Sequence, residues 1–295
     1  MDYRVEPILL NNPEVEREVE QLIAGTFGIP MPHGRVRLNT SAPGRPDPLY
    51  IAAIEDSTII GFNSFTAHCL TINGQEVLAF QSGWTATSAA HRGKKIFQNL
   101  ILSAQEILAA KGAGFIFGFP NQESRPIFVG KLGYREIQPL KWQVPNLPFS
   151  TRLFTRSGLA DVAALTRDAV MQDDAALIRL KRNERSTQVQ EFSHQGSLCW
   201  GVERMRAVRG MKLRYVDIGG LKLADSRHVP TVVHGLAARF PGAAYAQLVS
   251  TDGAPYNSLL KRLRPSATNI LIVRDLNRDT HGLRFNLFGG ARDVF

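Results

Sequence analysis

The chain has 295 residues, 44% hydrophobic and 21% charged, a balance typical of a globular protein with one or two domains. Its formal net charge of +9 favours acidic partners. Its two cysteines, Cys69 and Cys199, exclude a disulfide framework and show no metal-ligand spacing, which suits a reducing compartment. The N-terminus has no signal-peptide pattern and no apolar run is as long as a membrane span, so we expect a cytoplasmic protein without a metal.

Hydrophobic spacing predicts a mixed α/β order in the first half of the chain. In chain order we expect strand 3–10, helix 13–25, an irregular Pro-, Gly- and Arg-rich segment at 30–48, strands 48–55, 59–72 and 76–87, helix 96–108 and strand 115–121. Asn73-Gly74 is typical of a type I′ hairpin turn and joins the second and third of these antiparallel strands. The order indicates a mixed, mostly antiparallel sheet flanked by helices.

A basic turn, His91-Arg92-Gly93-Lys94-Lys95, lies between the third strand and the long helix that begins at Ile96. The first turn of a helix offers unpaired N–H groups and the positive end of the macrodipole. Arg92, Lys94 and Lys95 add formal charge there. The turn therefore has the chemistry of a phosphate site.

Two motifs in this region resemble the GNAT family of acyl-CoA N-acyltransferases. They are Thr85-Ala86-Thr87-x3-His91-Arg92-Gly93-Lys94-x-Ile96 and Asn121-x-x-Ser124 followed by Lys131-Leu132-Gly133-Tyr134. The resemblance implies that the Arg-Gly-Lys turn binds the pyrophosphate of coenzyme A and that the pantetheine lies between two diverging strands. It also implies acetyl-CoA as the cofactor.

The resemblance assigns further roles to individual residues. Backbone N–H groups of Thr85, Ala86 and Thr87 would contact the pantetheine and the acetyl oxygen. Arg92, Gly93, Lys94 and Ile96 follow the family pattern, whereas Lys95 stands where the family usually has glycine; as a residue at a helix start, it is expected to fit without backbone strain. Asn121 and Ser124 would either contact the cofactor or cap the next helix.

The proton-transfer groups are less clearly marked. The tyrosine that usually serves the family as general acid is replaced by Val129, and Tyr134 is expected to pack as the signature aromatic residue. His68, His91 and Glu123 are the candidates for the general base, acting directly or through water. A histidine in a strand is also a common core residue, and His91 fits a packing or cofactor contact equally well.

The second half of the chain shows a similar order of elements. Helices are expected at 158–171 and 174–185, then strands 197–206 and 211–217, helix 229–239, strand 244–250, helix 255–263 and strand 268–274. This repeats the order of residues 76–143, but no basic turn precedes the helix at 229. We therefore expect two tandem domains: residues 1–145 with the acyl-CoA site, and residues 146–295 as a degenerate GNAT-like copy.

These observations predict an N-acetyltransferase that moves an acetyl group directly from acetyl-CoA to a primary amine. A nucleotide-linked amino sugar would suit the basic charge and the Arg-rich segment at 35–45. Nucleic acid is a less favoured partner because the basic residues are dispersed, and the densest run, 179–185, is interrupted by an acid. The alternatives are an aminoacyl-tRNA-dependent transferase of the tandem GNAT type and a non-catalytic protein that binds coenzyme A.

Overall fold

The computed structural model describes residues 3–41, 44–145, 162–184, 189–208, 210–251, 266–267 and 270–287. The chain divides into two compact units that interleave along the sequence. Unit 1 contains residues 1–69, 77–136 and 271–280, and unit 2 contains residues 70–76, 137–270 and 281–295. The change of unit at 136/137 lies near the expected boundary at 145/146, whereas the return at 271–280 was not expected.

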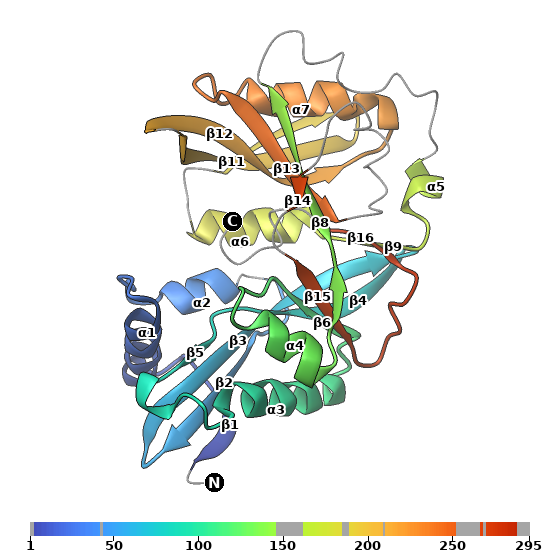
Figure 1. The fold of residues 1–295 in the computed structure, drawn as a ribbon. Helices are drawn as coiled ribbons and strands as arrows, with labels where there is room; N and C mark the ends of the chain where they lie inside the picture. The colour runs from blue at the N-terminus through green and yellow to red at the C-terminus, as the bar shows by residue number, and fades with distance from the viewer. Residues whose placement is uncertain are drawn as a thin grey trace. The chain divides into compact units, whose positions relative to one another are not determined.

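Unit 1 is built on a mixed sheet with the strand order β1-β2-β3-β4-β6-β15-β7 (Figure 1). Its strands are β1 (Arg4–Ile8), β2 (Leu49–Glu55), β3 (Thr58–Ile72), β4 (Gln75–Ser82), β6 (Phe115–Gly118), β15 (Leu271–Asp275) and β7 (Arg135–Ile137), and the short β5 (Ala86–Thr87) pairs with β3. β1 to β3 are antiparallel, whereas β4 and β6 run parallel on either side of helix α3 (Ile96–Ala110) in the sequence. The predicted mixed, mostly antiparallel sheet flanked by helices is thus confirmed.

The helices cover opposite faces of this sheet because neighbouring strand residues alternate between the two faces. Phe62 and Ala52 pack with Val19 and Ile23 of α1 (Pro13–Phe27) and Val36 of α2 (Arg35–Thr40). Gly61, on the other face, lies against Ile96 and Leu100 of α3. Each helix thus buries its apolar side on the sheet.

Local turn chemistry agrees with the sequence in one hairpin and differs in the segment 30–48. Asn73 and Gly74 both have positive φ angles, 50° and 79°, as the expected type I′ turn requires. The segment expected to be irregular contains the six-residue helix α2 instead. Val36 is fully buried there, and this tertiary packing sustains a helix that is too short to be stable by itself.

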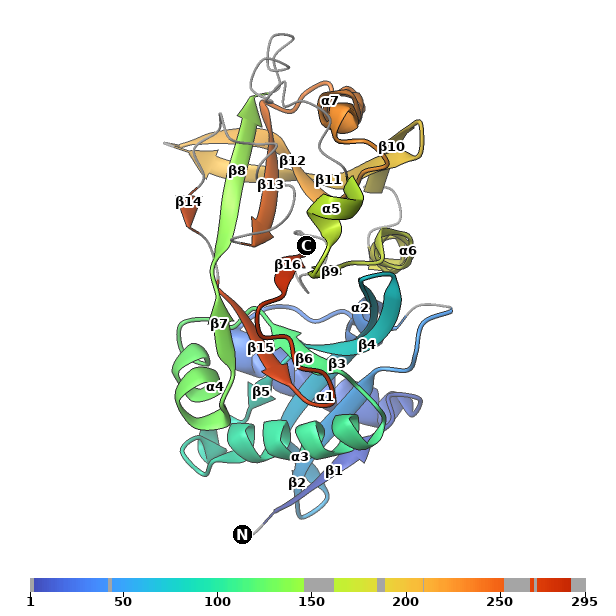
Figure 2. The same cartoon turned by 90° about the vertical axis from the view of Figure 1, so that its right-hand side faces the viewer.

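Unit 2 has a six-stranded sheet with the order β10-β11-β12-β13-β8-β14 (Figure 2). These strands are β10 (Val189–His194), β11 (Ser197–Val208), β12 (Met211–Lys222), β13 (Tyr245–Thr251), β8 (Pro139–Pro145) and β14 (Ser266–Ala267). Helix α7 (Val229–Ala237) packs through Val232, Val233 and Leu236 onto Val216 and Ile218 of β12. This apolar cluster is the core of the unit.

Each unit contains the same strand–helix–strand arrangement around a parallel pair of strands. In unit 1 the pair is β4 and β6, connected through α3, and in unit 2 it is β12 and β13, connected through α7. An antiparallel strand from the other half of the sequence flanks each pair: β15 lies beside β6, and β8 lies beside β13 (Figure 2). The two halves of the sequence therefore exchange one strand each.

Several elements expected in the second half differ in the structure. The helix expected at 158–171 is the shorter α5 (Val162–Thr166), followed by strand β9 (Ala169–Met171), which pairs with β16 (Arg284–Asn286). The strand expected at 268–274 is β15 of unit 1, and the helix expected at 255–263 lies outside the described residues. Helix α6 (Asp174–Glu184) matches its expected range closely. Among the described residues, no helix is both long and apolar enough to cross a membrane.

Candidate active site

The two strands that would hold a pantetheine arm separate at a defined point. β4 and β6 pair in parallel from Ala79↔Phe115 to Ser82↔Gly118, and β6 ends there. After β4, the chain bends and forms β5, which pairs only with β3 among the described strands. One edge of β5 therefore has no strand partner among the described residues, and an extended ligand would find main-chain partners there.

Thr85 fixes the bend between β4 and β5. Its hydroxyl donates to the carbonyl oxygen of Gly83 at 2.7 Å and accepts from Nδ2 of Asn63 at 2.8 Å. Asn63 is fully buried in β3, so this bond anchors the bend in the core. Ala86 is buried and Thr87 half-buried, and they pair with Phe62 and Gly61 of β3.

The basic turn lies exposed at the N-terminus of α3, as the phosphate hypothesis requires. Arg92, Gly93, Lys94 and Lys95 are all exposed, whereas Ile96 is buried against the sheet. Lys95, the N-cap residue of α3, makes no side-chain capping bond, and the first N–H groups of a helix have no intrahelical partner. Three cations thus surround the positive end of a 15-residue helix.

Lys95 has a left-handed backbone conformation, with φ 60° and ψ 17°. Glycine adopts this conformation without penalty, whereas an L side chain brings Cβ close to the following carbonyl oxygen. The expectation that a helix start accepts Lys95 without strain is therefore wrong. The same geometry explains why glycine is the preferred residue at this position of the motif.

The turn is held from one side by the N-terminal strand. The Tyr3 hydroxyl donates to the carbonyl oxygen of Lys94 at 3.1 Å and accepts from Nδ2 of Asn99 at 2.7 Å. Asn99 lies in the first turn of α3, so these two bonds connect the basic turn, the helix and residue 3. A ligand at the turn would meet a backbone that is already fixed.

Glu55, at the end of β2, holds the turn from the other side. Its Oε2 lies 2.8 Å from Nε2 of His91, and its Oε1 lies 3.7 Å from Nζ of Lys94. The hydrogen bond with His91 lowers the pKa of Glu55, with a smaller contribution from Lys94. His91 therefore positions the turn through Glu55, and the carboxylate lowers the net positive charge near Lys94.

Asn121 and Ser124 form the start of α4 (Arg125–Leu132). Oδ1 of Asn121 accepts from the backbone N–H groups of Glu123 and Ser124, at 3.1 and 2.8 Å, and from the Ser124 hydroxyl at 2.9 Å. These bonds are those of a helix-initiating turn. The capping alternative thus accounts for the Oδ1 of Asn121, while its exposed amide stays a predicted cofactor contact.

The region of the missing tyrosine offers no replacement hydroxyl among the described residues. Val129 lines a surface hollow of about 490 Å³ together with Gln122, Arg125, Pro126, Gly130 and Glu136. Tyr134 is buried and packs edge-on against Phe128, with ring centroids 4.8 Å apart. Burial raises the pKa of the Tyr134 hydroxyl far above its usual value. Tyr134 is therefore a packing residue.

The three base candidates lie in different surroundings. His68 is buried in β3 and contacts Phe117 edge-on at 5.1 Å, one residue before the point where β4 and β6 separate. His91 is at the phosphate end of the site. Glu123 is exposed at the start of α4. The structure therefore does not gather the three around one point.

The Arg-rich segment beside α1 is largely engaged with protein groups. Nε of Arg37 lies 3.2 Å from Oε1 of Glu16, and Arg45 donates to the carbonyl oxygen of Ala67. His33 contacts Glu20 at 3.1 Å. Glu16 and Glu20 are buried, and they bind the segment to α1. The sequence did not reveal this pairing, because acids on a helix usually face solvent.

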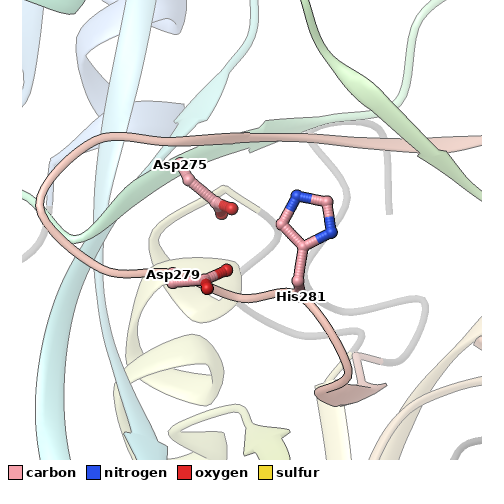
Figure 3. A group of neighbouring side chains, drawn as sticks. All are labelled: Asp275, Asp279 and His281. Carbon is pink, nitrogen blue, oxygen red and sulfur yellow. The ribbon is translucent and has the colours of Figure 1, made fainter.

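One group of potential metal ligands was not expected from the sequence. Asp275, Asp279 and His281 lie on one loop, and their ligand atoms are within 4.8 Å of one another (Figure 3). The Thr280 hydroxyl donates to Oδ1 of Asp275 at 2.5 Å and accepts from Arg135 at 2.6 Å. These bonds explain the shape of the loop, and two of the three ligands are exposed. We assign no metal to this group.

Comparison with known proteins matches part of unit 1 to a family model. Residues 11–137 match the family model of the acetyltransferase (GNAT) domain. No curated protein matches the chain by sequence. Residues 11–137 are therefore similar to an acetyltransferase (GNAT) domain, as the two motifs predict.

Solved structures share the fold over nearly the whole chain. A probable N-acyltransferase from Enterococcus faecalis is 12% identical, with a TM-score of 0.64 over 95% of this chain and 74% of that one. A GCN5-related N-acetyltransferase from Kribbella flavida is 12% identical, with a TM-score of 0.63 over 94% and 71%. Eis1 from Mycobacterium abscessus is 14% identical, with a TM-score of 0.59 over 93% and 73%. At these identities the likeness concerns the fold.

Proposed function

We propose that acetyl-CoA binds across unit 1, with its pyrophosphate at the basic turn and its thioester near the separation of β4 and β6. Arg92, Lys94 and Lys95 supply the charge, Gly93 and Ile96 supply backbone N–H groups, and Thr85 to Thr87 contact the pantetheine. The exposed, uncapped N-terminus of α3 is the single observation that supports this placement best. Asn121 and Ser124 are secondary cofactor contacts in this proposal.

The acceptor in this proposal is a primary amine of a small molecule. Its nitrogen attacks the thioester carbonyl, the new N–C bond forms, the C–S bond breaks, and coenzyme A leaves as the thiolate. The amine proton passes to a base. Of the candidates His68, His91 and Glu123, we favour His68 acting through water, because it lies nearest to the strand separation.

A nucleotide-linked amino sugar is the more specific acceptor candidate. The Arg-rich segment at 35–45 supports it, whereas the pairing of Arg37 with Glu16 removes one cation that it would need. The degenerate GNAT-like character of residues 146–295 is likewise a proposal, supported by the parallel β12–α7–β13 unit. The two free thiols suit the reducing cytoplasm that we propose as the location.

The test combines titration calorimetry with acetyl-CoA and a thiol-release assay over a panel of amines. Arg92→Ala with Lys94→Ala should weaken acetyl-CoA binding at least tenfold, since each charge-assisted bond contributes about 1.5–3 kcal/mol. His68→Gln should lower kcat while acetyl-CoA affinity stays unchanged.

The outcomes separate the alternatives. Unchanged affinity in the double variant would overturn the placement at α3. Binding without thiol release from any amine would favour a non-catalytic protein, and absence of binding would favour an aminoacyl-tRNA-dependent transferase.

A further inference from the structure

The net charge of the chain is confined to one of its two units. Unit 1 has 14 Lys and Arg residues and 14 Asp and Glu residues, so it is formally neutral. Unit 2 has 21 basic and 12 acidic residues, so it has the whole charge of +9. The charge is therefore not explained by the acetyl-CoA site, and it calls for a separate anionic partner of unit 2.

The outer part of the β11–β12 hairpin stands apart from the rest of its sheet. β10 pairs with β11 only as far as Val202, and β13 pairs with β12 only from Tyr215 onward. Between these limits, residues 203–208 and 211–214 pair only with each other among the described strands, and the carbonyl oxygen of Arg214, at the base, accepts from the N–H of Ala244 at 2.8 Å. They form a two-stranded segment that we call the basic ribbon, whose six-residue arm is about 20 Å long.

The register places positive charge on both faces of the basic ribbon. Arg204 and Arg206 lie on one face, and Lys212 and Arg214 lie on the other. Arg206, Lys212 and Arg214 are exposed, and residues 204–216 include no acid. Glu203, at the base, lies 3.6 Å from Arg214. In the sequence these basic residues are separated by other residues, and the pairing of β11 with β12 brings them close together.

Each face also has an exposed methionine. Met211 shares the face of Arg206 and is 61% exposed, whereas Met205 shares the face of Lys212 and is 68% exposed. Such exposure of large apolar side chains beside cations suits a partner with both phosphates and apolar edges. Other dense basic runs differ: in α6, Lys181 is buried and Arg182 is paired with Glu191 at 2.9 Å.

We propose that the basic ribbon binds duplex DNA through the major groove. A two-stranded β-ribbon fits this groove, which is about 12 Å wide, and phosphates line both of its walls. Cations on both faces meet both walls, and the methionines reach apolar base edges such as the thymine methyl group. An anionic membrane would meet one face only, and the narrow major groove of duplex RNA would exclude the ribbon.

Fluorescence anisotropy of the full-length protein with a labelled mixed-sequence DNA duplex tests the proposal. Neutralising about four phosphates predicts a slope of about −3.6 in a plot of log affinity against log salt. The double variant Arg206→Ala, Lys212→Ala should reduce this slope by about 1.8 and weaken binding at least tenfold at low salt. Neither residue belongs to the acetyl-CoA site, so thiol release should stay unchanged.

A matched control removes two charges at the other end of β12. Lys222→Ala with Arg227→Ala changes the net charge equally, and both residues lie away from the ribbon: Lys222 pairs with Leu198, and Arg227 lies in the turn Ser226–His228, where it pairs with Asp225. This control should keep the DNA slope. Equal losses in both double variants would show a diffuse charge effect and overturn the proposal. Tighter binding to duplex RNA or to phosphatidylserine vesicles than to DNA would overturn it as well.

Discussion

Lys95 is a non-glycine residue in a left-handed backbone conformation, within the basic turn. Its left-handed conformation costs about 1–2 kcal/mol relative to the right-handed one. Glycine avoids that cost but loses about 0.4–1 kcal/mol through the greater freedom of the unfolded chain. Strain relief is thus the larger of the two effects.

We therefore expect Lys95→Gly to be about 0.5–1 kcal/mol more stable than Lys95→Ala in urea unfolding. Both variants lack the charge, so their difference isolates the backbone effect. Acetyl-CoA affinity should fall similarly in both unless closer approach of the phosphate compensates in the glycine variant. Equal stability of the two variants would contradict the strain argument.

Asp174 is a second residue whose environment has a measurable effect, in this case on its pKa. It is buried in unit 2, and its Oδ1 accepts from Nε1 of Trp200 at 2.8 Å and from Nε2 of Gln172 at 2.6 Å. Burial raises the pKa of Asp174 to about 6, although the two hydrogen bonds oppose the rise. The folded state therefore holds a proton that the unfolded state releases near pH 4.

A raised pKa makes the folded state more stable at low pH, and this contribution is lost between about pH 4 and pH 6. The shift of about two units corresponds to about 3 kcal/mol. Asp174→Asn keeps an acceptor oxygen for Trp200 without ionising. Its stability advantage over the wild type in urea unfolding should grow from pH 4 to pH 7. A pH-independent difference would contradict the raised pKa.

The contact between α3 and β3 positions the start of α3, where the basic turn lies. Gly61 pairs with Thr87 of β5 and faces Ile96, the first residue of α3. A Cβ at position 61 would collide with Cγ2 of Ile96. Close packing at Gly61 therefore sets the position of the basic turn relative to the strand separation.

Gly61→Ala should lower stability by about 1–3 kcal/mol and raise the KM for acetyl-CoA, because α3 must move away from the sheet. Adding Ile96→Ala removes the colliding methyl group and should lower the KM part of the way back to the wild-type value. Thermal unfolding and steady-state kinetics measure the two effects. If the second substitution worsened KM further, the collision would not be its cause.

The elements around the acetyl-CoA site could be predicted from sequence because their signals are local. Asn73-Gly74 marked the β3–β4 hairpin, and the spacing from Ile96 to Leu108 marked α3. The conformation of Lys95 and the pairing of Arg37 with Glu16 depend on tertiary packing, which spacing does not encode. β15 was expected as a strand, but its partner β6 lies about 155 residues earlier, and a hydrophobic run does not identify such a distant partner.

At the scale of the whole molecule, the exchanged strands make the two halves of the sequence interdependent. Residues 1–145 alone lack β15, which leaves the edge of β6 unpaired, and residues 146–295 alone lack β8 beside β13. Unpaired apolar edges promote aggregation. A cut at 145/146 therefore separates each sheet from one of its strands.

We expect the fragment 1–145 to aggregate when expressed alone and to become soluble when co-expressed with 146–295. A fusion of residues 1–137 to 270–280 through a flexible linker restores β15 and should improve solubility over 1–137 alone. Size-exclusion chromatography distinguishes these outcomes. A monomeric, folded 1–145 fragment would show that β15 is dispensable.

The late position of β15 also matters during synthesis on the ribosome. After β7 emerges at Ile137, 138 further residues must be translated before Asp275 completes the sheet. At about 5–20 residues per second, the nascent protein exposes the open edge of β6 for roughly 7–28 s. During that interval a chaperone has time to shield Phe115 and Phe117. Chaperone supply should therefore affect the expression yield more strongly than it affects the stability of the finished protein.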